Sequence, residues 1–178
     1  GLNVTGGLLA GGPCILHGVN ENLGWAHTVN YCDRLDEFQL EMNPDNPLQY
    51  KFDGQWIDLE VRTIKLKIKG IPINVKRKVY WSKYGATMKN EQGFFSMRLG
   101  ANMKIGVLDQ WYQMNKAKNF TEFYTALNRQ ELSMFNIMYA DRYDTVFYIN
   151  NALMPVRDAT NGYNWKRTMP GNTSKTLW

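Results

Sequence analysis

The chain has 178 residues, of which 44% are hydrophobic and 13% aromatic, and its formal net charge at pH 7 is +5. This content of apolar and aromatic side chains is sufficient for a packed core and excludes a wholly disordered chain. No run of about 20 apolar residues occurs, so we expect no membrane partner. Two cysteines leave the redox compartment open.

The first part of the chain predicts short antiparallel strands. Glycines cluster in residues 5–12 without the GKS or GKT of a phosphate loop, so turns are expected there. Residues 13–19 predict a short buried strand, and residues 23–31 predict its partner after a turn rich in asparagine. A central hairpin over residues 13–31 is therefore predicted.

The middle of the chain predicts a second β-rich region. Asp53-Gly54, within the loop-like residues 43–56, predicts a hairpin turn. From residue 57 apolar and cationic side chains alternate, which predicts an antiparallel hairpin over residues 60–80 with one covered face. The expected turn is Gly70-Ile71-Pro72. Six cationic side chains cluster toward the turn of this hairpin: Lys65, Lys67, Lys69, Lys76, Arg77 and Lys78.

These six side chains are among only 21 Lys and Arg residues in the chain, so nucleic acid has to be considered as a partner. A cationic strand face is more often simply solvated, and this reading is preferred. We therefore expect no nucleic-acid partner. Nucleic-acid binding would instead predict an affinity that falls steeply with added salt.

The hydrophobic period changes near residue 103 and predicts two helices. The second is expected over residues 121–131 with Thr121 as its N-cap. Residues 135–150 return to strands, and the chain after Pro155 is loop-like. The apolar residues at helical spacing are Ile105, Leu108, Trp111 and Tyr112, then Phe123, Tyr124 and Leu127.

These patterns together predict an α+β chain dominated by antiparallel strands. Residues 18–29, GVNENLGWAHTV, resemble the GxNxxxxW(S/T/H)xT signature of the penicillin acylase family. Residues 139–148 resemble that family's ADxxGNIGY hairpin. Further segments that resemble the family in the same order are Asn43-Pro44 and residues 50–56, 108–111, 114–119 and 161–166.

The resemblance spans nearly the whole chain and implies a fragment of the αββα sandwich of N-terminal-nucleophile hydrolases. Within this single fragment of the β-subunit domain, residues 1–40 would form a core hairpin, residues 41–100 a β-rich insertion, and residues 101–178 a helix pair and a returning hairpin. It also implies an amidohydrolase that cleaves the acyl side-chain amide of a penicillin-like, acyl-homoserine-lactone-like or other small N-acyl substrate. Such enzymes are usually periplasmic or secreted.

The nucleophile of this family is the N-terminal serine of the β subunit, and its own α-amine acts as the base. Residue 1 here is glycine, which has no nucleophilic side chain. The family's second oxyanion donor, an asparagine, would lie beyond Trp178. We therefore expect an internal piece that is inactive alone, with the remaining α- and β-subunit segments of its precursor as partners.

The resemblance assigns a catalytic role to Val29, whose backbone N–H would donate to the tetrahedral oxyanion. This role needs only a fixed amide at a strand end, and the alternative is an ordinary core valine. The resemblance places His17 and His27 at the substrate pocket. Gly100 takes the place of a bulky aromatic residue there, and a smaller side chain would favour a longer acyl chain.

Residues 33–36 resemble the family's calcium-binding loop. The resemblance assigns as ligands the carboxylates of Asp33 and Asp36 and the carbonyls of Leu35 and Pro155. Calcium takes six to eight oxygens, so other segments would complete this structural site. The alternative is that Asp36 is a surface charge beside a neighbouring arginine.

Two further possibilities remain open. One is a zinc site formed by His17 and His27 with Cys14 and Cys32, since zinc uses such ligands. Residues 14 and 17 point to opposite faces of an extended chain, which argues against it. The other is a stand-alone β-rich carbohydrate- or ligand-binding module. The exposed aromatic side chains that it would use are Trp56, Trp81 and Trp165, although large aromatics are more often packed in a core.

Overall fold

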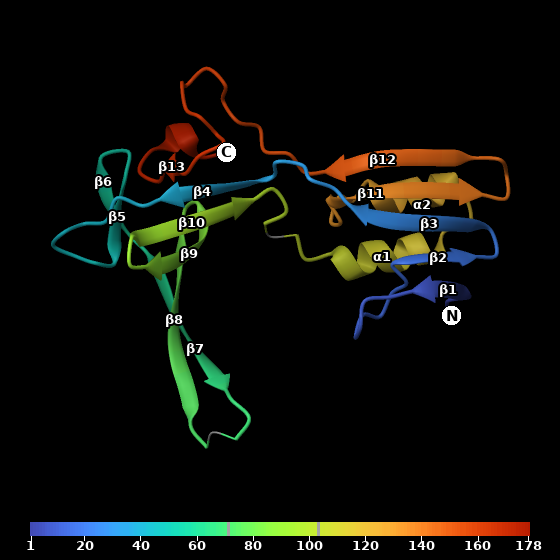
Figure 1. Ribbon diagram of the computed structural model, residues 1–178, viewed down its shortest axis with the longest axis horizontal. Helices are drawn as coiled ribbons and strands as arrows, with labels where there is room; N and C mark the ends of the chain where they lie inside the picture. The colour runs from blue at the N-terminus through green and yellow to red at the C-terminus, as the bar shows by residue number, and fades with distance from the viewer. Residues whose placement is uncertain (71, 103) are drawn as a thin grey trace. The chain divides into compact units, whose positions relative to one another are not determined.

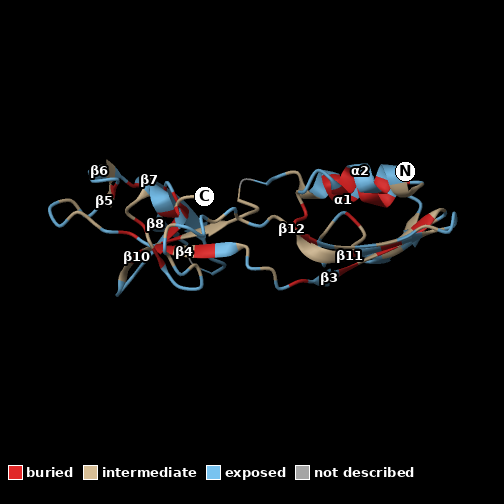
Figure 2. Cartoon of the chain, turned by 90° about the horizontal axis from the view of Figure 1, so that it is seen from above, coloured by how far each residue is buried: buried red, intermediate tan, exposed pale blue. Residues whose placement is uncertain are grey.

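The chain folds into two compact units, each assembled from two separate stretches of sequence (Figure 1). The computed structural model describes residues 1–70, 72–102 and 104–178. Unit 1 comprises Gly1–Arg34 and Met103–Met154, and unit 2 comprises Leu35–Asn102 and Pro155–Trp178. Each unit has its own cluster of buried hydrophobic side chains, which contribute to the red segments in Figure 2.

Unit 1 contains a five-stranded antiparallel sheet with the order β1-β2-β3-β11-β12. The central strand pairs with β2 on one side and with β11 on the other, which confirms the predicted hairpin over residues 13–31. The strands are β1 (Val4–Gly7), β2 (His17–Asn20), β3 (Leu23–Val29), β11 (Met134–Asp141) and β12 (Val146–Ala152).

Two helices, α1 (Val107–Lys116) and α2 (Phe120–Leu127), pack on one face of this sheet. Alternate residues of β3 are buried beneath them, as the period of two in a strand requires. Both predicted helices are thus confirmed, although residue 103, where the first was expected to begin, lies outside the described residues. Tyr124, expected to face inward, is 38% exposed.

The N-cap of α2 is Asn119, so the assignment of that role to Thr121 is wrong. The Asn119 side-chain oxygen accepts a hydrogen bond from the N–H of Glu122 at 2.9 Å. The Glu122 carboxylate in turn accepts from the N–H of Lys118 at 2.9 Å. Asparagine competes well for this position because its short side chain satisfies a helix N–H that has no partner within the helix.

Unit 2 contains a six-stranded sheet with the order β13-β4-β10-β9-β8-β7 and a separate two-stranded sheet, β5-β6. Asp53 and Gly54 connect β5 to β6 with φ values of 47° and 81°, which confirms the predicted hairpin turn. The strands are β4 (Leu35–Gln39), β5 (Gln49–Phe52), β6 (Gln55–Asp58), β7 (Glu60–Lys67), β8 (Asn74–Ser82), β9 (Gly85–Asn90), β10 (Gly93–Leu99) and β13 (Met169–Pro170).

Strands β7 and β8 form the predicted second hairpin, a long ribbon that extends from unit 2 (Figure 1). The residue Ile71 of the expected turn Gly70-Ile71-Pro72 lies outside the described residues. The alternation of apolar and lysine side chains is confirmed, but the expectation of a covered face is wrong. Ile64 and Leu66 are 39% and 43% exposed, because the ribbon extends away from the core that the other strands enclose.

The two-unit organisation differs from the predicted succession of residues 1–40, 41–100 and 101–178. Strand β4 pairs with β10 and with β13, so the end of the first segment and the tail of the last belong to unit 2. Local patterns do not contain such long-range strand pairings. Among the described helices, none has the length and hydropathy needed to cross a membrane.

Candidate active site

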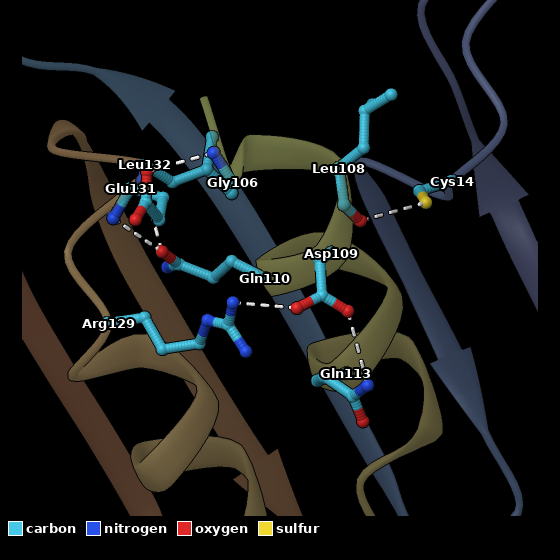
Figure 3. Close-up of polar contacts among 9 residues, drawn as sticks. All are labelled: Cys14, Gly106, Leu108, Asp109, Gln110, Gln113, Arg129, Glu131 and Leu132. Atoms are coloured by element: carbon cyan, nitrogen blue, oxygen red, sulfur yellow. Dashed lines mark hydrogen bonds and ion pairs between the residues drawn. The ribbon is translucent and has the colours of Figure 1, made fainter. Parts of the chain in front are cut away.

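Buried polar contacts hold helix α1 in place over the sheet (Figure 3). Gln110 is fully buried, and its Oε1 accepts hydrogen bonds from the N–H of Glu131 at 2.7 Å and of Leu132 at 3.1 Å. The Glu131 carboxylate accepts from the N–H of Gly106, just before the helix, at 3.0 Å. These contacts join the start of α1 to the segment that leads into β11, and so position Trp111 within the core of unit 1.

The ring of His27 lies in the aromatic part of this core. It is 3% exposed, and its centroid lies 6.0 Å from that of Trp111 and 5.5 Å from that of Phe135. Its Nδ1 is 2.7 Å from the carbonyl oxygen of Leu16, which can only accept, so Nδ1 carries a proton. The buried Nε2 atom has no hydrogen-bond partner among the described residues.

Burial lowers the pKa of His27 from 6.5 to about 4, since desolvation penalises the charged ring. The neighbouring His17 lowers it further, while the hydrogen bond to Leu16 acts in the opposite direction. At neutral pH His27 is therefore uncharged, with a lone pair on Nε2. The chemistry available to this atom is acceptance of a hydrogen bond or a proton.

His17 and His27 lie close together in unit 1. The backbone N–H of His27 donates to Nδ1 of His17 at 2.9 Å, and the two ring centroids are 6.2 Å apart. Within residues 1–70, 72–102 and 104–178, no three His, Cys, Asp or Glu side chains group in a way that could hold a metal ion.

Val29 is the last residue of β3 and its side chain is 63% exposed, so it is not the core valine of the alternative reading. Its carbonyl accepts a hydrogen bond from Nδ2 of Asn136 at 3.3 Å. The same Nδ2 lies 3.2 Å from the hydroxyl of Thr28. The hydroxyl of Tyr148 donates to Oδ1 of Asn136 at 3.0 Å, which fixes the orientation of that amide.

The residue after Val29 is also held firmly. Asn30 is buried, and its Nδ2 donates to Oδ1 of Asn150 and to the carbonyl of Asn151, both at 2.9 Å. Its Oδ1 accepts from Arg34 at 3.3 Å. The Val29 carbonyl and the Asn30 side chain are thus held by groups of β11 and β12. A fixed amide at a strand end is what an oxyanion donor requires.

Gly100 lies in the other unit. His17, His27 and Val29 lie in unit 1, whereas Gly100 follows β10 in unit 2. The part of the substrate pocket that the resemblance assigns to Gly100 therefore stays a prediction.

The residues assigned to calcium are also divided, since Asp33 lies in unit 1 and Leu35, Asp36 and Pro155 lie in unit 2. The carboxylate of Asp36 is buried and holds two hydrogen-bond donors on Oδ2. One of these donors is a cationic guanidinium, which repels a metal ion. The surroundings of Asp36 in this structure therefore do not fit a calcium ligand, although the ion itself stays untested.

Sequence reasoning missed the residues that hold the assigned ones in place. Asn136 binds the Val29 carbonyl, and Asn30 binds a backbone carbonyl of β12. Gln110 holds α1 by accepting from the N–H of Glu131. The sequence showed only that amide residues occur within predicted strands or helices. Such residues are common there when they reach solvent, so they indicate a structural role only when burial is known.

The sequence profile of the penicillin amidase family matches residues 1–178. Acyl-homoserine lactone acylase PvdQ of Pseudomonas fluorescens (strain Pf0-1) is 30% identical over 165 residues, which is 86% of this chain and 21% of that relative. Penicillin G acylase of Escherichia coli is 24% identical over 181 residues, which is 100% of this chain and 21% of that relative. The chain thus spans about a fifth of the length of these curated relatives.

A solved structure has the same fold. The thermostable penicillin G acylase from Alcaligenes faecalis matches with a TM-score of 0.83 and 24% sequence identity, over 96% of this chain and 31% of that one. The likeness confirms the predicted fold class, an antiparallel-strand-rich piece of this hydrolase architecture with two helices. The family match and the named relatives favour an acylase over a stand-alone carbohydrate-binding module.

Proposed function

Since the chain belongs to the penicillin amidase family, we propose that it works as part of an acylase that hydrolyses the linear amide of an N-acyl substrate. The named relatives, an acyl-homoserine lactone acylase and a penicillin G acylase, support this reaction class. The remaining α- and β-subunit segments of the enzyme are then the partners of this chain. We propose a periplasmic or secreted location, by analogy with the family.

The observation that carries this proposal is the fixed strand end at Val29. Its carbonyl is held by Asn136, and the next residue, Asn30, is buried among hydrogen bonds to β12. An oxyanion donor is effective when it does not have to reorganise as charge develops in the transition state. We propose that the Val29 N–H is one such donor, and that the nucleophile, the base and the second donor come from other segments.

The acyl group is proposed from the relatives and from two pocket residues. The 30% identical relative is named for acyl-homoserine lactones, which favours that class over penicillins. His27 is neutral and lies among aromatic rings, which suits an apolar acyl chain better than a charged one. Gly100, lacking a side chain, would leave room for a long chain.

The test compares two substitutions at Val29 in the full-length enzyme. Val29→Ala keeps the backbone N–H and should retain most activity. Val29→Pro removes the N–H and should lower kcat by a factor on the order of 10²–10³. Circular dichroism and thermal unfolding show whether each variant folds. Equal losses of kcat in two folded variants would remove Val29 from the oxyanion site.

The isolated chain serves as the second arm of this experiment. It should not hydrolyse phenylacetyl or long-chain acyl amides, because an activated nucleophile, a base and two oxyanion donors must be held together. Turnover by the isolated chain that survives substitution of His17 and His27 would place the catalytic residues elsewhere within it, and the proposed division of labour would be wrong.

A further inference from the structure

A buried carboxylate that accepts two hydrogen bonds lies near the start of β4. Asp36 is 2% exposed, and its Oδ2 accepts hydrogen bonds from Nε of Arg157 at 2.9 Å and from Nε1 of Trp178 at 2.7 Å. The Arg157 side chain is itself largely buried. Both donors come from the C-terminal stretch of unit 2, which is distant from β4 in the sequence.

A second guanidinium lies close to this pair. Arg98 of β10 stands directly across the sheet from Asp36 in the antiparallel register. Its guanidinium lies 4.9 Å from the ring centroid of Trp178 and donates to the carbonyl of Lys83 at 3.2 Å. The guanidinium of Arg157 lies 6.0 Å from the Trp165 ring. The surroundings of Asp36 are thus cationic and aromatic.

These contacts bear directly on the calcium expectation. Calcium requires carboxylate oxygens that are not engaged by N–H donors, and it is repelled by nearby positive charges. At Asp36 one carboxylate oxygen holds two N–H donors, one of them the guanidinium of Arg157. A buried carboxylate nevertheless needs a counter-charge, because desolvation of an unpaired ion is costly.

We propose that Arg157 supplies the positive charge at Asp36 that the family resemblance would assign to a calcium ion. Arg157 is two residues beyond Pro155, and Asp36 follows Leu35, so the ion pair joins the same two segments that the metal was expected to join. Trp178 completes the site by donating its indole N–H to the same oxygen. Unit 2 therefore folds without calcium bound at Asp36.

The first experiment measures thermal unfolding of the 178-residue chain with a chelator, with no addition, and with millimolar CaCl2. The Tm should be the same in all three conditions. Arg157→Ala should lower the Tm by about 10 °C or more, because it leaves a buried carboxylate without its counter-charge. Arg157→Lys keeps a charge and should lose less, which also covers the case in which the alanine variant does not fold.

Arg62→Ala is the matched control, because Arg62 pairs with Glu60 in an ion pair whose side chains are both well exposed. Its Tm should change by no more than about 2 °C. A loss in Arg157→Ala no larger than in this control would contradict the proposal. So would a Tm of the unsubstituted chain that rises with calcium and falls with chelator, if Asp36→Asn abolished that response.

A spectroscopic experiment tests the metal directly. Terbium replaces calcium at oxygen sites and luminesces when a nearby indole transfers energy to it, and Trp178 is in contact with Asp36. Titration of the chain with terbium should give no saturable emission that depends on this pair. Saturable emission that is lost in both Asp36→Asn and Trp178→Phe would place a metal at Asp36 and overturn the proposal.

Discussion

In unit 1 the buried imidazole of His27 has no charged partner among the described residues, whereas unit 2 buries Asp36 against Arg157. The first group avoids the desolvation penalty by staying neutral, and burial accordingly lowers the pKa of His27 to about 4. For Asp36, the opposite charge of the Arg157 guanidinium compensates the cost of burial. The two solutions predict different responses to substitution and to pH.

The contrast has a functional side. Nε2 of the neutral His27 ring is buried and has no hydrogen-bond partner among the described residues. It can therefore accept a hydrogen bond from a group outside them. The Asp36 pair directs its bonds inward and holds two segments of its own unit together. We therefore expect changes at His27 to alter substrate handling in the full enzyme, and changes at Asp36 to alter mainly stability.

The largest expected effect follows from removing one member of the charged pair. Asp36→Ala should lower the free energy of unfolding by about 3–5 kcal/mol, since it removes the buried carboxylate that binds the Arg157 guanidinium and the Trp178 indole N–H. Urea unfolding of the single and double variants measures this. The loss in Asp36→Ala/Arg157→Ala should be clearly smaller than the sum of the two single losses. Additive losses would show that the pair does not act as a unit.

The next effect is the pH dependence that His27 imposes on unit 1. The pKa of His27 is about 4 in the folded chain and about 6.5 when unfolded, so between these values the unfolded chain binds more protons. Stability is therefore complete above pH 6.5 and declines as the pH falls toward 4, by roughly 3 kcal/mol at most. Unfolding measured across this range should show a steeper acid loss in the unsubstituted chain than in His27→Gln.

Gln110 tests how much a buried side chain without charge contributes to stability. Gln110→Ala should cost about 2 kcal/mol, because the N–H groups of Glu131 and Leu132 lose their acceptor in the interior. Gln113→Ala, one turn along the same helix, is the matched control, since its side chain makes only an exposed contact with Asp109. Urea unfolding should separate the two variants. Equal small losses would mean that water replaces the Gln110 oxygen.

The smallest expected effect concerns the start of α2. Asn119→Ala should cost about 1 kcal/mol, because Asn119 caps the helix. Thr121→Ala should leave stability within about 0.5 kcal/mol of the unsubstituted chain. The same measurement decides between the observed N-cap and the one that the sequence predicted. A larger loss at Thr121 would reverse the assignment.

The sequence predicted those elements whose causes are local. The lysine alternation in β7, the Asp53-Gly54 turn and the apolar spacing of α1 each result from side-chain period or turn chemistry within a few residues. The family resemblance added the fold class, and it gave the role of Val29 that stays a prediction. Each of these features depends on residues that are neighbours in the chain or match a known motif.

The rest depended on contacts between distant residues. The join of β4 to β13, the clamp of Asn136 on Val29 and the pair formed by Asp36 and Arg157 each span more than 100 residues. No periodicity reports which buried carboxylate will meet which guanidinium, because the partner is chosen by tertiary packing. The resemblance predicted a metal ion at Asp36, whereas the structure has the guanidinium of Arg157 bonded to that carboxylate.

The ribbon of β7 and β8 carries a consequence for the behaviour of the protein in solution. In the described sheet β7 is the outermost strand, so its outer edge offers backbone N–H and C=O groups to any other strand. Lys65 and Lys67 place positive charge along that edge and discourage a second copy from adding its own ribbon. Acetylation of these lysines removes their charge and should therefore make the protein more prone to β-aggregation. The lysines of β7 thus oppose aggregation through this edge.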